Sequence, residues 1–363
     1  MPFTTQTFLH LPKHLRMEHK PVHYGEYLQL DKILNAQSPV SNTNGSDAHD
    51  EMLFIIIHQT YELWFKQVLF ELGSVLDIMS KPALNDNSGD LQTIVHRLDR
   101  VATIQKLLVQ QIDILETMTS MDFLDFRDML RPASGFQSIQ FKILEARLGL
   151  KFDNRHGRDY YTSQLKKDEI ENLKESEKES SLIDLVNAWL ERMPFFNKDL
   201  YWKKYPSLSA EESLHPFWDD YEKLYTEGLF EGEKNNAAHF REIFYENASD
   251  VPRTLSASAC RSALFIMLYR GYPMLELPFQ MMNALLEIDN QLGNWRSRHI
   301  NMVRRMIGSR VGTGGSSGAG YLQGAMDKHY IFKELAQLSS FLIDRRKLPK
   351  LPVELTGKLG YNF

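Results

Sequence analysis

The sequence predicts an all-α protein, and three observations support this fold class. Long stretches carry apolar residues three and four positions apart, the period of a helix that packs one face. Segments that alternate between apolar and polar residues and are bounded by turns, as half-buried strands are, are nearly absent. Of the 363 residues, 43% are apolar, which is enough to bury a large core. We therefore expect a helical bundle with a smaller helical insertion.

The clearest helical pattern covers residues 50–79, and Asp47 or Asp50 is expected to cap its start. At about 100° per residue, its apolar positions fall within one narrow arc. The residues on this stripe are Phe54, His58, Tyr61, Phe65, Val68 and Leu72.

A second amphipathic helix is expected over residues 91–118, which contain neither Gly nor Pro. The loop 81–90, rich in Asn, Asp, Ser and Gly, separates it from the first. A shorter helical stretch follows at 123–130. The turn 131–135, with the sequence RPASG, then breaks the pattern before it resumes over 136–148.

Residues 162–181 are a run rich in Lys, Glu and Ser, which is typical of a solvated helix or connector. Helical patterns return at 182–193, 211–247, 254–269 and 278–305.

Composition limits the partners and the compartment. The chain has 42 Lys and Arg against 47 Asp and Glu, a net charge of −5, so charge gives no argument for nucleic acid. The longest wholly apolar run, 52–57, is far too short for a membrane helix, and the first residues lack the apolar stretch of a secretory signal. The single cysteine, Cys260, cannot form an internal disulfide. We expect a cytoplasmic protein without membrane or nucleic-acid partners.

Two histidines lie on apolar helical faces. His58 follows Phe54 by one turn, and His299 shares a face with Trp295, Met302, Val303 and Met306. Each pattern is typical of a packed core histidine, and also of a ligand, because haem iron takes a neutral histidine nitrogen between apolar walls. The pattern alone does not separate these interpretations.

Two further features suit a small ligand. The segment 312–320, GTGGSSGAG, is either a flexible linker or a loop that closes over a polar ligand with the hydroxyls of Thr313, Ser316 and Ser317. Arg127 could offer a bidentate fork to a carboxylate. Equally, it could pair with a nearby acidic residue: Asp125, Asp128 or Glu145.

Metal sites built from other histidines are weaker candidates. His10, His14, His19 and His23 are spaced four and five apart, but prolines interrupt the helical face. His49 and Glu51 form an HxE pair that could belong to a non-haem iron site, although acidic residues also favour a helix start.

Several blocks together resemble the tryptophan 2,3-dioxygenase family. They are residues 24–39 (YGEYLQLDKILNAQSP), 49–72 (with IIIHQTYELWFKQ), 107–149 (with FLDFRDMLRPASGFQ), 278–308 (with NWRSRHINMVRRMIG) and 311–318 (VGTGGSSG). The resemblance covers nearly the whole chain and is weakest over about 155–250.

The resemblance implies an all-α, homotetrameric enzyme that holds one non-covalent haem b per subunit. Such an enzyme inserts both atoms of O2 across the C2–C3 bond of the L-tryptophan indole and gives N-formyl-L-kynurenine, the first step of the kynurenine route of tryptophan catabolism. By the motifs of the family, His299 is the axial ligand of the haem iron and His58 is the distal histidine that binds the indole N–H. The other implied site residues are Phe54 against the indole, Arg127 and Thr313 at the amino-acid end, and Ser134, Gly135 and Trp295 in the haem pocket.

The resemblance also implies a domain plan. Residues 1–48 would form an arm that brings Tyr24 and Tyr27 to the substrate pocket of a neighbouring subunit. Residues 49–363 would form the catalytic domain, with a variable helical insertion at about 155–250. Two departures from the family pattern concern Phe123, which is Tyr in some bacterial relatives, and the AGYL sequence after the glycine loop.

Three other functions compete with this interpretation. A related haem enzyme could act on a substituted tryptophan or another indole, or insert one oxygen atom. A helical scaffold could have kept the fold and lost catalysis, although it would have no reason to retain His58, Arg127 and His299 together. A non-haem iron oxygenase built on His49 and Glu51 is the most distant alternative.

Overall fold

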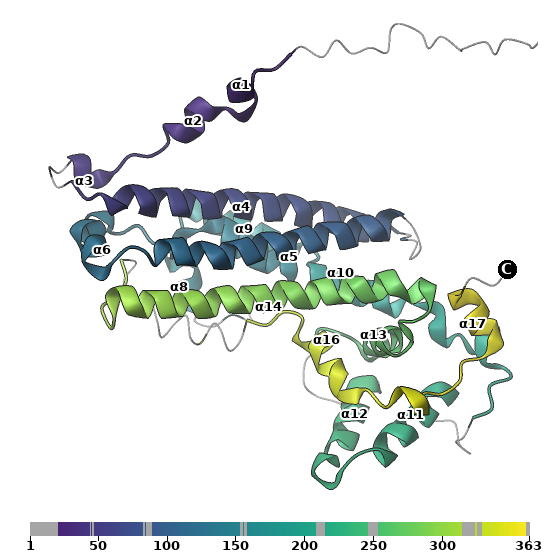
Figure 1. Ribbon diagram of the computed structural model, residues 1–363. Helices are drawn as coiled ribbons and strands as arrows, with labels where there is room; N and C mark the ends of the chain where they lie inside the picture. The colour runs from purple at the N-terminus through teal and green to yellow at the C-terminus, as the bar shows by residue number, and fades with distance from the viewer. Residues whose placement is uncertain are drawn as a thin grey trace, which may run out of the picture. The chain divides into compact units, whose positions relative to one another are not determined.

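The computed structural model describes residues 21–43, 45, 47–82, 84, 89–152, 155, 158–207, 215–245, 253–313, 324 and 329–360. The chain divides into two compact units, Met1–Pro39 and Val40–Phe363. Throughout the described ranges the regular structure is helical and contains no strand, which confirms the all-α prediction (Figure 1).

The first unit contains two short helices, α1 (Tyr24–Leu28) and α2 (Leu30–Leu34). Neither helix has a buried residue, and Tyr24 and Tyr27 are 71% and 74% exposed. Helices of this length are marginal in water without tertiary packing. This segment therefore has no core of its own among its described residues.

Three long helices form the body of the second unit: α4 (Asp50–Met79), α5 (Gly89–Leu115) and α14 (Pro273–Ile307). They run side by side in Figure 1, and α5 contacts both α4 and α14. Their inward faces meet in one apolar core, as the repeats in the sequence predict.

The segment between α5 and α7 (Ile139–Leu148) is compact and irregular. Helix α6 (Ser120–Arg127) starts with a capping box in which Thr119 and Asp122 each accept a hydrogen bond from the main-chain N–H of the other. The predicted RPASG turn is confirmed, with a cis peptide bond before Pro132. Single 3-10 turns, Asp128–Leu130 and Gly135–Gln137, flank it.

The described residues of the region 155–250 are largely helical. Those from Leu182 onward pack into the same core as the long helices, whereas Tyr161 and Leu173 form a smaller cluster with Ala146. The helices of this region are α8 (Arg158–Ser163), α9 (Lys167–Lys178), α10 (Leu182–Glu191), α11 (Pro216–Glu227) and α12 (Asn236–Phe244). The 3-10 turns Pro194–Phe196 and Glu231–Glu233 and the π-helical turn Lys198–Trp202 connect them.

The chain closes with α13 (Ala257–Tyr269) before α14, then α16 (Lys333–Gln337) and α17 (Val353–Leu359) after it. Two 3-10 turns, Leu338–Phe341 and Arg345–Lys347, lie between the last two helices.

Three local predictions were wrong. A single helix over 211–247 is not found, because the chain breaks at Gly228, the residue that ends α11, before α12 begins. No acidic side chain caps α4, since His49 occupies the N-cap position without a side-chain bond. Helix α14 begins five residues before Pro278, because Pro273 takes the first-turn position that favours proline.

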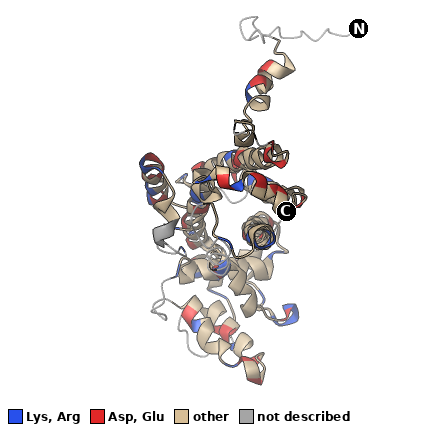
Figure 2. Cartoon of the chain, turned by 90° about the vertical axis from the view of Figure 1, so that its left-hand side faces the viewer, with Lys and Arg blue, Asp and Glu red and all other residues tan. Residues whose placement is uncertain are grey.

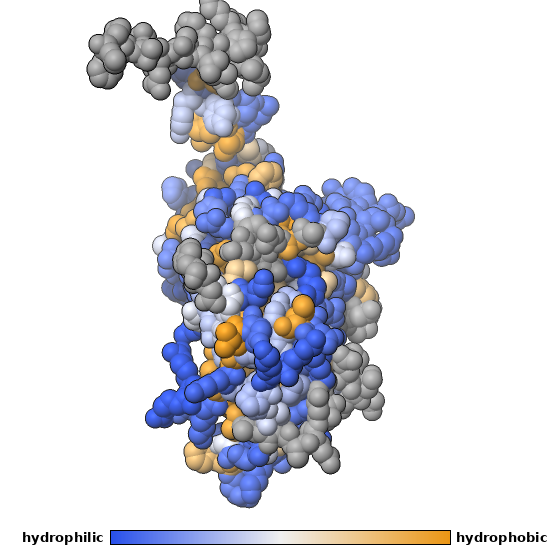
Figure 3. Space-filling view, turned by 90° about the vertical axis from the view of Figure 1, so that its right-hand side faces the viewer, coloured by the Kyte–Doolittle hydropathy of each residue, from blue (hydrophilic) through white to orange (hydrophobic). Residues whose placement is uncertain are grey.

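The surface agrees with the charge balance of the sequence. Basic and acidic side chains are interspersed along the helices in Figure 2, and the face in Figure 3 is mostly hydrophilic with scattered apolar residues. Among the described residues, no helix is both long enough and apolar enough to cross a membrane.

Candidate functional site

A cavity of about 310 Å³ lies within the second unit, between α4, α6, α7 and α14. The residues of the sequence-based site that line it are Phe54, His58, Arg127, Ser134, Gly135, Trp295, His299 and Thr313. These residues come from both halves of the chain and meet only because α4 and α14 lie in one bundle. The structure thus brings eight of the ten predicted site residues together.

His299 projects from α14 beside Trp295, whose ring stacks on the imidazole with centroids 4.9 Å apart and planes 10° from parallel. Its Nδ1 is buried and has no hydrogen-bond partner within the described part of the chain. Burial, with a smaller contribution from His58, lowers the pKa of His299 to about 4. At neutral pH the ring is therefore uncharged and keeps a nitrogen lone pair, as a metal ligand must.

His58 projects from α4 into the same cavity. Its Nδ1 lies 2.7 Å from the main-chain oxygen of Phe54. Desolvation lowers the pKa of His58, while the Phe54 hydrogen bond and the charge of Glu62 oppose that shift. The ring is thus held neutral, with its orientation fixed from its own helix.

Aromatic rings form a slot beside His58. The ring of Phe54 lies 4.1 Å from that of His58, 5.7 Å from Phe123 and 5.5 Å from Phe126, measured between centroids. Phe126 is fully buried, whereas Phe54 and Phe123 reach the cavity surface. The slot offers apolar faces to a flat ring.

Arg127 is the last residue of α6 and is 4% exposed. Its Nη2 donates to the main-chain oxygen of Val311, and its Nη1 lies 3.6 Å from Asp128, one of the partners that the sequence suggested. Its Nε is buried without a partner in the described residues. The guanidinium is therefore anchored at one end and retains an unused donor, which suits a carboxylate.

Smaller polar groups complete this part of the wall. Ser134 caps the turn Gly135–Gln137, with its hydroxyl accepting from the N–H of Phe136 at 3.4 Å. Thr313 reaches the cavity just after Val311. The rest of the glycine loop, with Ser316 and Ser317, lies outside the described residues.

A charged cluster at the cavity wall was not predicted from the sequence. The Glu145 carboxylate accepts from Arg155 Nη1 at 2.5 Å and from Arg296 Nη2 at 2.6 Å, and His329 lies 3.9 Å away. Although burial raises it, these charges lower the pKa of Glu145 to about 2. Lys142 adjoins the cluster and also lines the cavity.

The sequence held one usable signal for this cluster. Lys142 and Glu145 interrupt the buried face of a helix, next to Leu144 and Ala146, and charged residues in such positions need partners. Arg155 belongs to no periodic segment, so its role required the fold.

The remaining candidates lie elsewhere. Tyr24 and Tyr27 belong to the first unit. The Glu51 carboxylate accepts from the N–H groups of Val40 and Ser41 at 2.7 and 2.9 Å, which gives it a structural role. His10, His14 and His19 lie outside the described residues, and the described chain contains no group of three or more His, Cys, Asp or Glu side chains placed to hold a metal.

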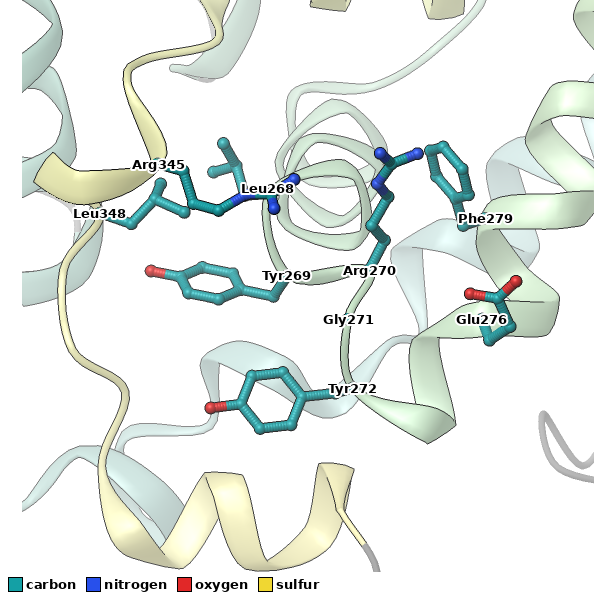
Figure 4. Close-up of a pocket in the computed structure, with 9 residues that line it drawn as sticks. All are labelled: Leu268, Tyr269, Arg270, Gly271, Tyr272, Glu276, Phe279, Arg345 and Leu348. Carbon is teal, nitrogen blue, oxygen red and sulfur yellow. The ribbon is translucent and has the colours of Figure 1, made fainter.

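A second depression, of about 500 Å³, lies where α13 meets α14 (Figure 4). Tyr269, Tyr272 and Phe279 line it together with Arg270 and Arg345. Arg270 lies over the ring of Phe279, 4.8 Å from its centroid. Its lining residues include no histidine, so it lacks the ligand chemistry of the first cavity.

Comparison with known proteins agrees with this arrangement. The family model described as Tryptophan 2,3-dioxygenase matches residues 12–342. A tryptophan 2,3-dioxygenase of Bdellovibrio bacteriovorus is 41% identical over 96% of this chain and 100% of its own length. The tryptophan 2,3-dioxygenase of Alteromonas mediterranea is 44% identical over 94% of this chain and 98% of its own length. Tryptophan 2,3-dioxygenase B of Danio rerio is 44% identical over 90% of this chain and 84% of its own length. The chain therefore belongs to the tryptophan 2,3-dioxygenase family.

Proposed function

We propose that this protein inserts both atoms of O2 across the C2–C3 bond of the L-tryptophan indole and releases N-formyl-L-kynurenine, the first step of tryptophan catabolism by the kynurenine pathway. One observation carries the proposal: a neutral histidine on each of two facing helices and an anchored arginine line the same cavity, namely His58, His299 and Arg127. Taken singly, each of these residues could be explained as part of the packed core. Packing does not explain why all three line the same cavity.

The cavity would hold a non-covalent haem b, one per subunit, with His299 as the ligand of its iron. The ring of His299 is uncharged and its Nδ1 has no hydrogen-bond partner among the described residues, which gives it the donor chemistry that haem iron needs. Trp295, Met302 and Met306 supply apolar walls beside it. Ser134 and Gly135 would line the same pocket. Haem supplies an iron centre that binds O2.

The chain's own residues then position the substrate. The indole fits between Phe54 and the neighbouring rings, with its N–H directed to Nε2 of His58. The substrate carboxylate fits the free Nε–H side of Arg127. Thr313 would add a hydroxyl contact at the amino-acid end. Binding tryptophan at both ends restricts its translation and rotation before the reaction. The reaction with O2 then does not have to bear this entropy cost.

The reaction needs no external reductant, because the indole supplies both electrons that each oxygen atom needs. It also needs no strong base, and a neutral His58 suits the task of accepting the indole N–H. The residues around the slot are chiefly aromatic and apolar, which limits water near the reacting ring.

We further infer a homotetramer in which residues 1–48 act on a neighbouring subunit. The short helices α1 and α2 expose their apolar side chains and bury none. A second copy of the chain would cover them and would receive Tyr24 and Tyr27 at its substrate pocket. Such covering supplies the packing that these helices lack.

The proposal is tested with the purified, haem-supplied protein. We expect a Soret band and, after anaerobic reduction, conversion of L-tryptophan in air to N-formyl-L-kynurenine that carries two labelled atoms from ¹⁸O2. His299→Ala should sharply lower haem content while leaving helical circular dichroism intact. A wild-type protein without a Soret band would refute the haem assignment, and a product with one labelled oxygen would refute dioxygenation.

A further inference from the structure

The cavity wall has an apolar tier and a charged tier built by the same two helices. On α7 and α14, Phe141 and Trp295 face each other with ring centroids 5.1 Å apart. The next residues along each helix, Lys142 and Arg296, belong to the charged cluster around Glu145. One side of this wall therefore suits a flat apolar ring, and the adjoining side suits anions.

The charged tier contains three buried cations, and their carboxylate partners are shared unevenly among them. The cations Lys142, Arg155 and Arg296 are each no more than 5% exposed. Glu145 accepts hydrogen bonds from both arginines, and Glu177 lies 3.9 Å from Arg155. The buried Asp289 interacts electrostatically with Arg296. A buried cation without a directly bonded carboxylate is costly, so such a cation in a cavity wall indicates an anionic ligand.

Lys142 is the cation without a directly bonded carboxylate, although the charge of Glu145 acts on it from a greater distance. Its Nζ lies 4.3 Å from the centre of the Tyr161 ring, and no hydrogen-bond acceptor or carboxylate pairs with it among the described residues. Arg155 lies on the same ring, 3.9 Å from its centre. Burial lowers the pKa of Lys142 to about 8, so it remains mostly charged at pH 7.

We propose that Lys142, together with Arg155 and Arg296 held in place by Glu145, binds the propionate carboxylates of haem. This inference rests on the haem of the proposed function and adds the residues that hold its charged edge. Arg296 also donates to the main-chain oxygen of His329 at 3.0 Å, so the cluster is fixed from three segments before a ligand arrives. A preorganised cation site binds carboxylates without reordering its own side chains.

The competing source of a carboxylate is tryptophan itself. Arg127 belongs to a different part of the cavity wall, since it contacts Val311 and Asp128 and not the Glu145 cluster. We assign the substrate carboxylate to Arg127 and the haem carboxylates to Lys142, and the experiment separates the two.

The test compares haem with its dimethyl ester, which keeps the macrocycle and removes both charges. Each is titrated into haem-free protein and followed by the Soret band and by quenching of tryptophan fluorescence. Lys142→Met should weaken haem binding by about 10- to 100-fold and change ester binding by less than about 2-fold. Lys106→Met is the matched control, because Lys106 is an exposed lysine paired with Glu287 at 2.9 Å.

A conservative variant guards against misfolding. Lys142→Arg keeps the charge and should restore most of the haem affinity, whereas a merely structural role would weaken haem and ester alike. Equal haem binding by wild type and Lys142→Met would overturn the proposal. So would a loss confined to L-tryptophan binding with tryptamine unaffected, since that assigns Lys142 to the substrate. A wild-type protein that binds neither porphyrin refutes the proposed function instead.

Discussion

The imidazole Nδ1 of His58 and the main-chain oxygen of Phe54 lie 2.7 Å apart, and this contact decides the tautomer of the histidine. A carbonyl oxygen can only accept, so Nδ1 must carry the proton. Because the lowered pKa keeps the ring neutral, Nε2 is left as an acceptor. His58 is therefore prepared to receive an N–H donor before any substrate binds.

The first prediction tests that acceptor. His58→Ala should weaken the binding of L-tryptophan by about 5-fold, because one hydrogen bond in a closed site contributes about 1 kcal/mol. It should have little effect on 1-methyl-L-tryptophan, which has no indole N–H. Binding is measured by titration of the ferrous protein without oxygen. Equal losses for both ligands would mean that His58 shapes the slot instead of bonding to the indole.

The long helices could be predicted because their apolar repeats continue through many turns. Helix α4 begins and ends at the predicted residues 50 and 79. The single helix expected over 211–247 shows the limit, since a periodic pattern continues through a break as short as Gly228–Asn235. Local breaks depend on a few main-chain angles, which periodicity does not report.

The site could be predicted only in part. His58, Arg127 and His299 are polar residues on apolar helical stretches, so the pattern made them candidates, and the family resemblance gave them roles. Glu145 and Arg296 are 151 positions apart in the sequence. Their contact depends on how α7 and α14 pack, and no local pattern contains that information.

The second prediction concerns Arg127. Arg127→Met should raise the KM for L-tryptophan by about 10- to 100-fold, the usual effect of losing a charge-assisted hydrogen bond, while haem content stays unchanged. Tryptamine, which lacks the carboxylate, should bind equally to both proteins. Steady-state kinetics and ligand titration provide the measurements.

Arg131→Met provides the control for Arg127. Arg131 is exposed in the turn that follows α6 and lies 3.6 Å from the same Asp128 carboxylate, so its loss removes an equal charge outside the cavity. We expect its KM to remain within about 2-fold of wild type. If Arg127→Met and Arg131→Met behave alike, the clamp is rejected.

The third prediction follows from the lowered pKa of Glu145. A carboxyl that titrates at about 2 when folded, against 4.5 ordinarily, stabilises the protein above pH 4.5 and loses that effect as the pH falls toward 2. Glu145→Gln should therefore reduce the free energy of unfolding by about 3 kcal/mol at pH 7. The difference from wild type should shrink between pH 4.5 and pH 2.

Urea unfolding of the haem-free protein at several pH values measures this difference. Asp113→Asn is the comparison, because Asp113 pairs with Arg298 at 2.6 Å on the surface and should contribute less than about 1 kcal/mol. A Glu145→Gln deficit that stays constant from pH 7 to pH 3 would show that lost packing, and not charge, causes the instability.

The last prediction tests exchange of the arm between subunits. Replacing both Tyr24 and Tyr27 by Ala should lower kcat/KM for L-tryptophan by about 10-fold or more, since each exposed aromatic ring would lose one contact with a partner's pocket. His299→Ala should be inactive because it lacks haem.

Co-expression of these two variants distinguishes exchange from action within one chain. In a mixed oligomer, the arm of an His299→Ala subunit is intact and would serve a neighbour that has its haem but lacks Tyr24 and Tyr27. Activity per haem should then rise above that of the double tyrosine variant alone. If each arm serves its own subunit, every chain in the mixture lacks either haem or tyrosines, and activity per haem stays at the level of the double variant.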